Sequence, residues 1–152
     1  MTKEQWMQKT IELAYENTVN GGKPFGAIIV KDDEIVAVGV NEVLETHDPT
    51  AHAELLAIRR ATEKLQTTDL SDCQLYASGE PCPMCMGAIY WANFKDVYYA
   101  YSSEEEEQAG LGTSHVYAQL ALSREEREIQ LQHVERQAET NDAFALWIEK
   151  QQ

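Results

Sequence analysis

Two stretches give the clearest indication of the fold: GEPCPMCMGAIYWA at residues 79–92 and DPTAHAELLAIRRA at residues 48–61. In the first, a proline at the start of an apolar run predicts a helix over Pro83–Ala92, because proline is tolerated in the first helical turn. In the second, Asp48-Pro49-Thr50 opens a helix that runs to about Gln66. Strand-like segments lie on either side of both helices. This alternation predicts a layered α/β domain.

The remaining segments complete the α/β pattern. An apolar stripe predicts an amphipathic helix over residues 3–19. Further helices are expected around residues 116–122 and from about residue 141. Strands are expected at residues 27–30 and 35–38, joined as a hairpin, and at residues 73–78, 96–101 and around 129–134. The acidic run Glu104–Glu107 is interpreted as the solvated start of a helix. With no repeat and no linker in the sequence, residues 1–152 are expected to form one domain.

Three residues have the spacing of metal ligands: His52, Cys82 and Cys85. The two cysteines are spaced i, i+3, so both thiolates leave the same side of one helical turn. They lie at a helix N-terminus, where the backbone dipole favours the thiolate form that a metal needs. His52 is expected in the first turn of its own helix. Two helix N-termini pointing into one site bring these side chains to a single zinc ion.

Three protein ligands indicate a catalytic zinc, because a structural zinc is closed by four. Cys73 is expected to be a buried, inert thiol, and His47, His115 and His133 lack any paired spacing. Glu54 is two residues from the predicted histidine ligand, about 200° around a helix, so the two do not share a ligand position. We expect Glu54 to act as a general acid and base beside the metal.

H-x-E followed by P-C-x-x-C is the signature of zinc nucleobase deaminases. The two stretches above, with NGGKPFGAIIVKDDEIVAVGVNEV at residues 20–43, resemble the cytidine and deoxycytidylate deaminase superfamily. The forms PFGA and CPMC-x-GAIYWA are similar to the bacterial guanine deaminases. The resemblance covers most of residues 5–101 and implies a three-layer α/β/α fold with a mixed sheet of about five strands. It also implies zinc ligation by His52, Cys82 and Cys85, proton transfer by Glu54, and substrate contacts from Asn41, Phe25, Trp91 and Ala53.

The reaction implied by this resemblance is zinc-dependent hydrolysis of a nucleobase amino group, most simply guanine to xanthine and ammonia. Guanine deaminases commonly carry an acidic residue after an A-G-aromatic segment, and the matching residues 109–114 here, AGLGTS, contain none. The alternatives are therefore a tRNA adenosine deaminase, a cytosine or deoxycytidylate deaminase, and a deaminase of a purine nucleoside, pterin or triazine. A zinc-stabilised binding module without turnover is the non-enzymatic alternative.

Charge argues against nucleic acid as a partner. The chain has 12 Lys and Arg against 26 Asp and Glu, a net charge of −14, and its basic residues are scattered. Nucleic-acid binding needs a basic face. No apolar run approaches the roughly 20 residues of a transmembrane helix, and the N-terminus lacks the apolar core of a secretion signal. We expect a cytoplasmic enzyme that acts on a small molecule and binds no membrane.

The C-terminal segment carries an apolar cluster on a short helix, formed by Phe144, Leu146, Trp147 and Ile148. A domain of this size does not leave such a cluster in water. The guanine deaminases that this chain resembles exchange their C-terminal segments, which implies exchange of residues 104–152 here. We expect a homodimer in which residues from about Asn141 onward complete the partner's site. Docking of the helix on its own subunit is the alternative.

Overall fold

A mixed four-stranded sheet lies at the centre of the computed structural model, which describes all residues from 1 to 152. The strands are β1 (Gly26–Lys31), β2 (Glu34–Val40), β3 (Gln74–Gly79) and β4 (Asp96–Tyr101), in the order β2-β1-β3-β4. Strand β1 is antiparallel to both β2 and β3, whereas β3 and β4 are parallel. The expected hairpin and the two later strands are confirmed.

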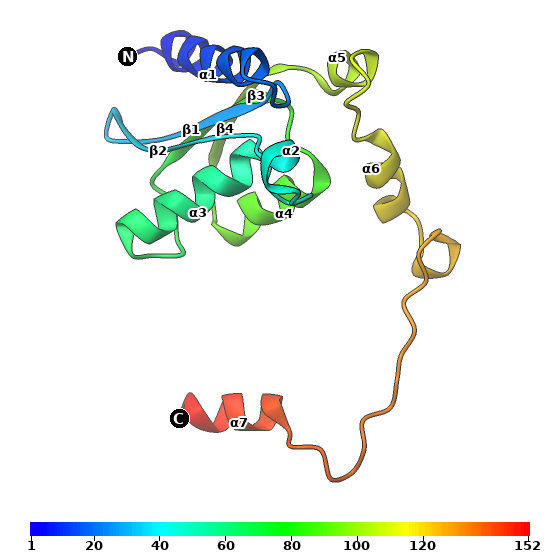
Figure 1. Ribbon diagram of the computed structural model, residues 1–152. Coiled ribbons are helices and arrows are strands. Elements are labelled where there is room, and N and C mark those ends of the chain that lie inside the picture. The colour runs from blue at the N-terminus through cyan, green and yellow to red at the C-terminus, as the bar shows by residue number, and fades with distance from the viewer. The chain divides into compact units, whose positions relative to one another are not determined.

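Helices cover both faces of this sheet (Figure 1). Helix α1 (Lys3–Val19) covers one face, and α3 (Ala53–Leu65) and α4 (Pro83–Trp91) lie on the other. Strand β1 explains the arrangement, because Ile28 and Val30 pack with residues of α1 while Ala27 and Ile29 join the cluster under α3 and α4. Side chains alternate across a strand, so a strand buried on both faces needs a layer on each. The three-layer α/β/α fold follows.

The ends of three strands lie next to one another at the same end of the sheet. They mark the position of the candidate functional site. Phe25 precedes β1, Asn41 follows β2 and Glu80 follows β3. Because β1 is antiparallel to its two neighbours, its start lies beside their ends. Gly39 lets α3 approach closely there, since an added Cβ would overlap the carbonyl oxygen of Ala53.

The beginning of α3 differs from the expectation. The helix starts at Ala53, with His52 as its N-cap residue and not within the first turn. Asp48 instead closes a local turn, accepting hydrogen bonds from the Thr50 backbone N–H at 2.8 Å and from the Thr50 hydroxyl at 2.7 Å. A short helix, α2 (Val43–Thr46), precedes this turn. The chain therefore enters α3 through a folded loop that fixes the direction of His52.

The strand expected around residues 129–134 is not formed. Residues 127–137 have neither helical nor strand structure, and the sheet has four strands where about five were expected. A β-strand requires a hydrogen-bonded neighbour, and within this chain no strand pairs with this segment. This prediction is wrong for the single chain.

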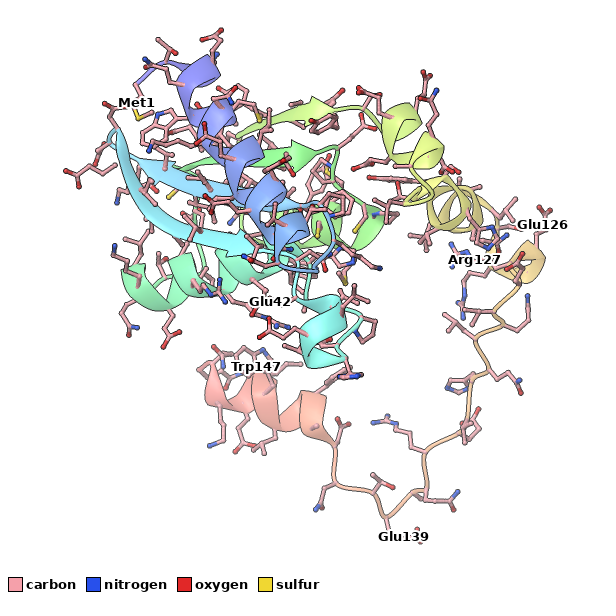
Figure 2. The ribbon with its side chains drawn as sticks, turned by 45° about the horizontal axis from the view of Figure 1, so that its top comes forward. Met1, Glu42, Glu126, Arg127, Glu139 and Trp147 are labelled. Carbon is pink, nitrogen blue, oxygen red and sulfur yellow. The ribbon has the colours of Figure 1, made fainter.

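The chain divides into two units, Met1–Gln119 and Leu120–Gln152. The first unit contains the sheet, its covering helices, α5 (Ser103–Gln108) and most of α6 (Ser114–Ala121). Residues 104–119 thus belong with the sheet, and the Tyr117 hydroxyl donates a 2.6 Å hydrogen bond to the Pro81 carbonyl. The second unit holds the 3-10 turn η1 (Arg124–Glu126) and helix α7 (Ala143–Lys150), joined by an extended stretch that passes Glu139 (Figure 2). None of the helices has the length and apolar character that crossing a membrane demands.

Candidate metal centre and active site

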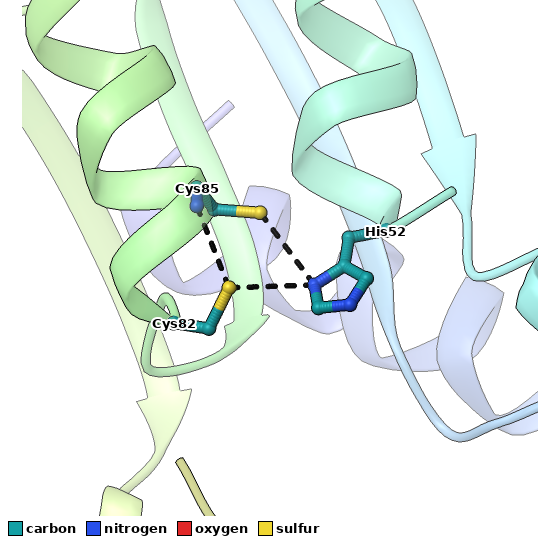
Figure 3. Close-up of side chains that lie close together, drawn as sticks. All are labelled: His52, Cys82 and Cys85. Atoms are coloured by element: carbon teal, nitrogen blue, oxygen red, sulfur yellow. Dashed lines mark hydrogen bonds between the residues drawn. The ribbon is translucent and has the colours of Figure 1, made fainter. Parts of the chain in front are cut away.

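His52, Cys82 and Cys85 converge where α3 and α4 begin (Figure 3). His52 is the N-cap residue of α3 and Cys82 that of α4. The Nδ1 atom of His52 lies 3.4 Å from the Cys82 Sγ and 3.7 Å from the Cys85 Sγ. The ligand atoms of all three residues lie within 4.8 Å of one another. Helix α4 supplies both sulfurs from one turn, as the i, i+3 spacing predicts.

These separations fit a zinc ion. With Zn–S bonds of roughly 2.3 Å and Zn–N bonds of roughly 2.0 Å, a tetrahedral site places its ligand atoms about 3.5–3.8 Å apart. No other cluster of three His, Cys, Asp or Glu side chains in the chain has metal-binding geometry. Cys73 lies outside the site, is fully buried, and has a pKa raised to about 11 mainly by that burial. Its interpretation as an inert thiol agrees with this position.

The electrostatics of the two cysteines suit a cation between them. Hydrogen bonding by the Cys85 thiol is the main factor that lowers the pKa of Cys82, to about 4, and His52 adds to it. The backbone N–H of Cys85 also donates to the Cys82 Sγ at 3.4 Å. Conversely, the pKa of Cys85 is raised by this hydrogen bond to Cys82 and by burial. Without a cation, the two cysteines therefore share one proton. A bound divalent cation would keep both sulfurs as thiolates.

Glu54 lies one helical step inside α3 and is 6% exposed. Burial, together with the nearby sulfur of Cys82, raises the pKa of its carboxyl group to about 7. A carboxyl group with a pKa near neutrality both accepts and donates a proton at physiological pH. It does not belong to the cluster of candidate ligands. The structure thus places a group suited to proton transfer beside the metal centre.

A cavity of about 450 Å³ opens onto His52, Glu54 and Cys82. Of the expected substrate contacts, Asn41 and Phe25 line this cavity. Asn41 is held firmly, because its Oδ1 accepts a 3.0 Å hydrogen bond from the Val43 N–H and its backbone oxygen accepts one from Asn17. These two residues are therefore in place to contact a substrate.

The other two expected substrate contacts are positioned differently. Ala53, the first residue of α3, is completely buried and is not among the residues that line the cavity. Trp91 is 86% exposed at the end of α4 and does not line the cavity either. With a rise of 1.5 Å per residue, it lies roughly 13 Å along the helix from Cys82. A resemblance in sequence carries no information about this distance.

Sequence reasoning missed Glu106. The run Glu104–Glu107 was expected to be a solvated face, but Glu106 is 5% exposed and lines the cavity. Ser102 and Glu105 form a capping box that marks the first turn of α5 but does not show which of its residues is buried. The interpretation is wrong for Glu106 and right for its neighbours, which are exposed.

Comparisons with known proteins agree with this geometry. Residues 1–101 match the family described as the cytidine and deoxycytidylate deaminase zinc-binding region. The chain is 48% identical over 130 residues to a guanine deaminase of Bacillus subtilis, covering 85% of this chain and 83% of that protein. A solved structure of Bacillus subtilis guanine deaminase superposes with a TM-score of 0.91 and 44% identity, over 98% of this chain and 95% of that one. A tRNA-specific adenosine deaminase of Aquifex aeolicus is 41% identical over 100 residues, 66% of each chain.

Proposed function

Because this chain belongs to the cytidine and deoxycytidylate deaminase family, we propose that it hydrolyses guanine to xanthine and ammonia. It is a zinc-dependent aminohydrolase, like the proteins it is similar to. One observation carries the choice of substrate: the likeness to guanine deaminase extends through most of the chain, in sequence and in structure. The likeness to the tRNA-specific enzyme covers about two thirds of it.

We assign zinc ligation to His52, Cys82 and Cys85, and proton transfer to Glu54. Zinc bound by these residues would supply a Lewis acid that makes water nucleophilic near neutral pH. Glu54 takes the two protons of the attacking water in turn and delivers one to the ring nitrogen and one to the departing amino nitrogen, so that water and guanine give xanthine and ammonia. Its raised pKa supports both roles, because neither protonation state is strongly favoured at pH 7. Asn41 and Phe25 orient the base.

The charge of the cavity disfavours phosphorylated substrates. Three carboxyl side chains line it, from Glu54, Glu80 and Glu106, and Lys23 is the only Lys or Arg among the lining residues. Binding a nucleotide or tRNA requires cations that neutralise phosphate. A neutral base lacks this requirement. The lining therefore supports a free base over deoxycytidylate or a tRNA anticodon.

We further propose a homodimer that exchanges its C-terminal segments. The unit Leu120–Gln152 exposes large apolar side chains: Ile129, Leu131, Val134, Phe144, Leu146, Trp147 and Ile148. No strand of the chain pairs with the strand-like residues 129–134, and β4 forms an open edge of the sheet. An open edge accepts another strand. A second copy of the chain would cover these groups and supply the missing neighbour. The cytoplasmic location stays a prediction.

The experiment that tests the proposed function is a screen for ammonia release by the zinc-loaded protein. Guanine is compared with guanosine, adenine, cytosine, cytidine, a pterin and a triazine amine, and xanthine is identified as the product. We expect the highest kcat/KM for guanine. A zinc-loaded protein that releases no ammonia from guanine would overturn the assignment. The Glu54→Gln variant serves as the background control.

A further inference from the structure

Glu106 is a buried carboxyl group that the proposed reaction does not use. It lies on α5 with 5% of its surface exposed, while Glu104, Glu105 and Glu107 on the same short helix are exposed. The Oε1 atom of Glu106 is buried and has no hydrogen-bond partner. Buried polar atoms are almost always hydrogen-bonded, and an exception calls for an explanation.

The position of Glu106 connects it to the metal centre. It lines the same cavity as His52, Glu54 and Cys82. Its Oε2 fills the space that a Cβ on Gly79 would occupy, beside the ring of Phe25. A side chain at position 79 would therefore displace this carboxyl group. The hydroxyl oxygen of Thr113, another lining residue, is also buried without a hydrogen-bond partner.

The charged groups that act most strongly on Glu106 are all acidic. Burial is the main cause that raises the pKa of its carboxyl group to about 7. The charges of Glu54, Glu80, Cys82 and Glu107 contribute to this increase in the same direction. A buried carboxyl group without a hydrogen-bond partner destabilises the fold. Groups of this kind recur at sites where a bound ligand supplies the missing hydrogen bond. The missing partner of a carboxylate oxygen is an N–H or O–H donor.

We propose that Glu106 determines specificity by accepting hydrogen bonds from N–H groups of the base. The inference rests on the proposed function, because it takes the cavity as the place where the base binds. A carboxyl group in this role favours substrate bases that are rich in ring N–H and amino donors, as 2-amino-6-oxopurines are. The Thr113 hydroxyl provides a second polar contact in the same cavity. Gly79 is the residue that leaves room for the carboxyl group.

The first test compares Glu106→Gln and Glu106→Leu with Glu104→Gln, a matched change on the exposed side of α5. KM and kcat for guanine, zinc content and the thermal midpoint are measured for each zinc-loaded protein. We expect Glu106→Leu to raise KM at least about tenfold, since hydrogen bonds to charged groups are strong. Zinc content should be unchanged, and the thermal midpoint equal to or above that of the wild type. Glu104→Gln should match the wild type throughout.

Two results would overturn the proposal. One is a KM for guanine within twofold of the wild type in Glu106→Leu. The other is a raised KM accompanied by loss of zinc or a lower thermal midpoint, which a structural role predicts. If the wild type deaminates another base and not guanine, the proposed function fails. The same KM comparison on that base then decides the role of Glu106.

A second variant tests the contact with Gly79. Gly79→Ala should raise KM in the wild-type background, because the added Cβ displaces the Glu106 carboxyl group. In the Glu106→Leu background the same change should raise KM no further, since residues that act through one contact are not additive. If the fold-changes in KM caused by Gly79→Ala and Glu106→Leu multiply in the double variant, the proposed role of Gly79 is contradicted.

Discussion

The Nδ1 atom of His52 lies 3.4 Å from the Sγ atom of Cys82, although the two residues are 30 positions apart in the chain. Each is the N-cap residue of a different helix, α3 for His52 and α4 for Cys82. Because both helices pack on the same face of the sheet, their N-termini converge there. The fold therefore assembles the ligand atoms at the spacing that a tetrahedral metal requires.

The first prediction is one zinc ion per chain that depends on these ligands. The double variant Cys82→Ala, Cys85→Ala should lose the metal, because two of the three ligand atoms are gone. Cys73→Ala is the matched control, since that thiol is buried away from the site. Metal analysis of the purified proteins checks both. Undiminished zinc in the double variant would reject the ligand assignment.

Glu54→Gln should keep zinc and fold while losing turnover. The substitution preserves the shape of the side chain and removes its ability to carry a proton, and general acid–base catalysis contributes about 10²–10⁴-fold. Glu63→Gln, an exposed change on the same helix, provides the control. Steady-state ammonia release measures the effect. Activity of Glu54→Gln within a few-fold of the wild type would exclude the proton-transfer role.

Gly39→Ala should destabilise the fold and weaken zinc retention together. An added Cβ overlaps the Ala53 carbonyl oxygen and comes within 2.9 Å of the Ala57 nitrogen, so α3 must move with its N-cap residue His52. Overpacking of this kind costs about 1–3 kcal/mol. Gly87→Ala in α4 is the control, since its added Cβ meets nothing within 4 Å. Denaturant unfolding should show a lower free energy of unfolding for Gly39→Ala and no decrease for Gly87→Ala.

The stability of the protein should depend on pH through Glu106. The pKa of this group is raised from 4.5 to about 7 on folding, so the folded state binds its proton more tightly than the unfolded state does. Its contribution to stability is therefore complete below pH 4.5 and is lost as the pH rises from 4.5 to about 7. The charges of Glu54, Glu80, Cys82 and Glu107 act on this pKa in the same direction as burial.

The Glu106→Gln variant isolates this contribution. Relative to the wild type, it should gain on the order of 1–3 kcal/mol in free energy of unfolding between pH 5 and pH 8. Glu104→Gln should follow the wild type across the same range. Parallel pH profiles of Glu106→Gln and the wild type would show that the Glu106 pKa is not raised.

Features that depend on local sequence could be predicted, and features that depend on distant packing could not. Helix α1 and strand β4 match their expected bounds because apolar periodicity is a local property. The pairing of Cys82 and Cys85 followed from their spacing within one helical turn, whereas His52 was inferred from its place at the start of a second helix. The strand at residues 129–134 failed because a strand exists only with a neighbour. The burial of Glu106 depends on the space at Gly79, 27 residues earlier, which no local pattern contains.

The last prediction concerns the exchange of the C-terminal segment. Deleting residues 141–152 removes α7, whose Phe144, Trp147 and Ile148 are exposed in the single chain. If this helix completes a partner's site, the truncated protein should keep zinc and lose affinity for the base. A truncated protein that stays dimeric with unchanged KM would show that residues 141–152 neither close the partner's site nor hold the two chains together. Mixing then separates exchange from docking on the same subunit. Glu54→Gln chains carry an intact helix, truncated chains carry an intact Glu54, and each is impaired alone. Activity restored on refolding them together requires the helix of one chain to serve the site of the other, whereas additive background activity excludes it.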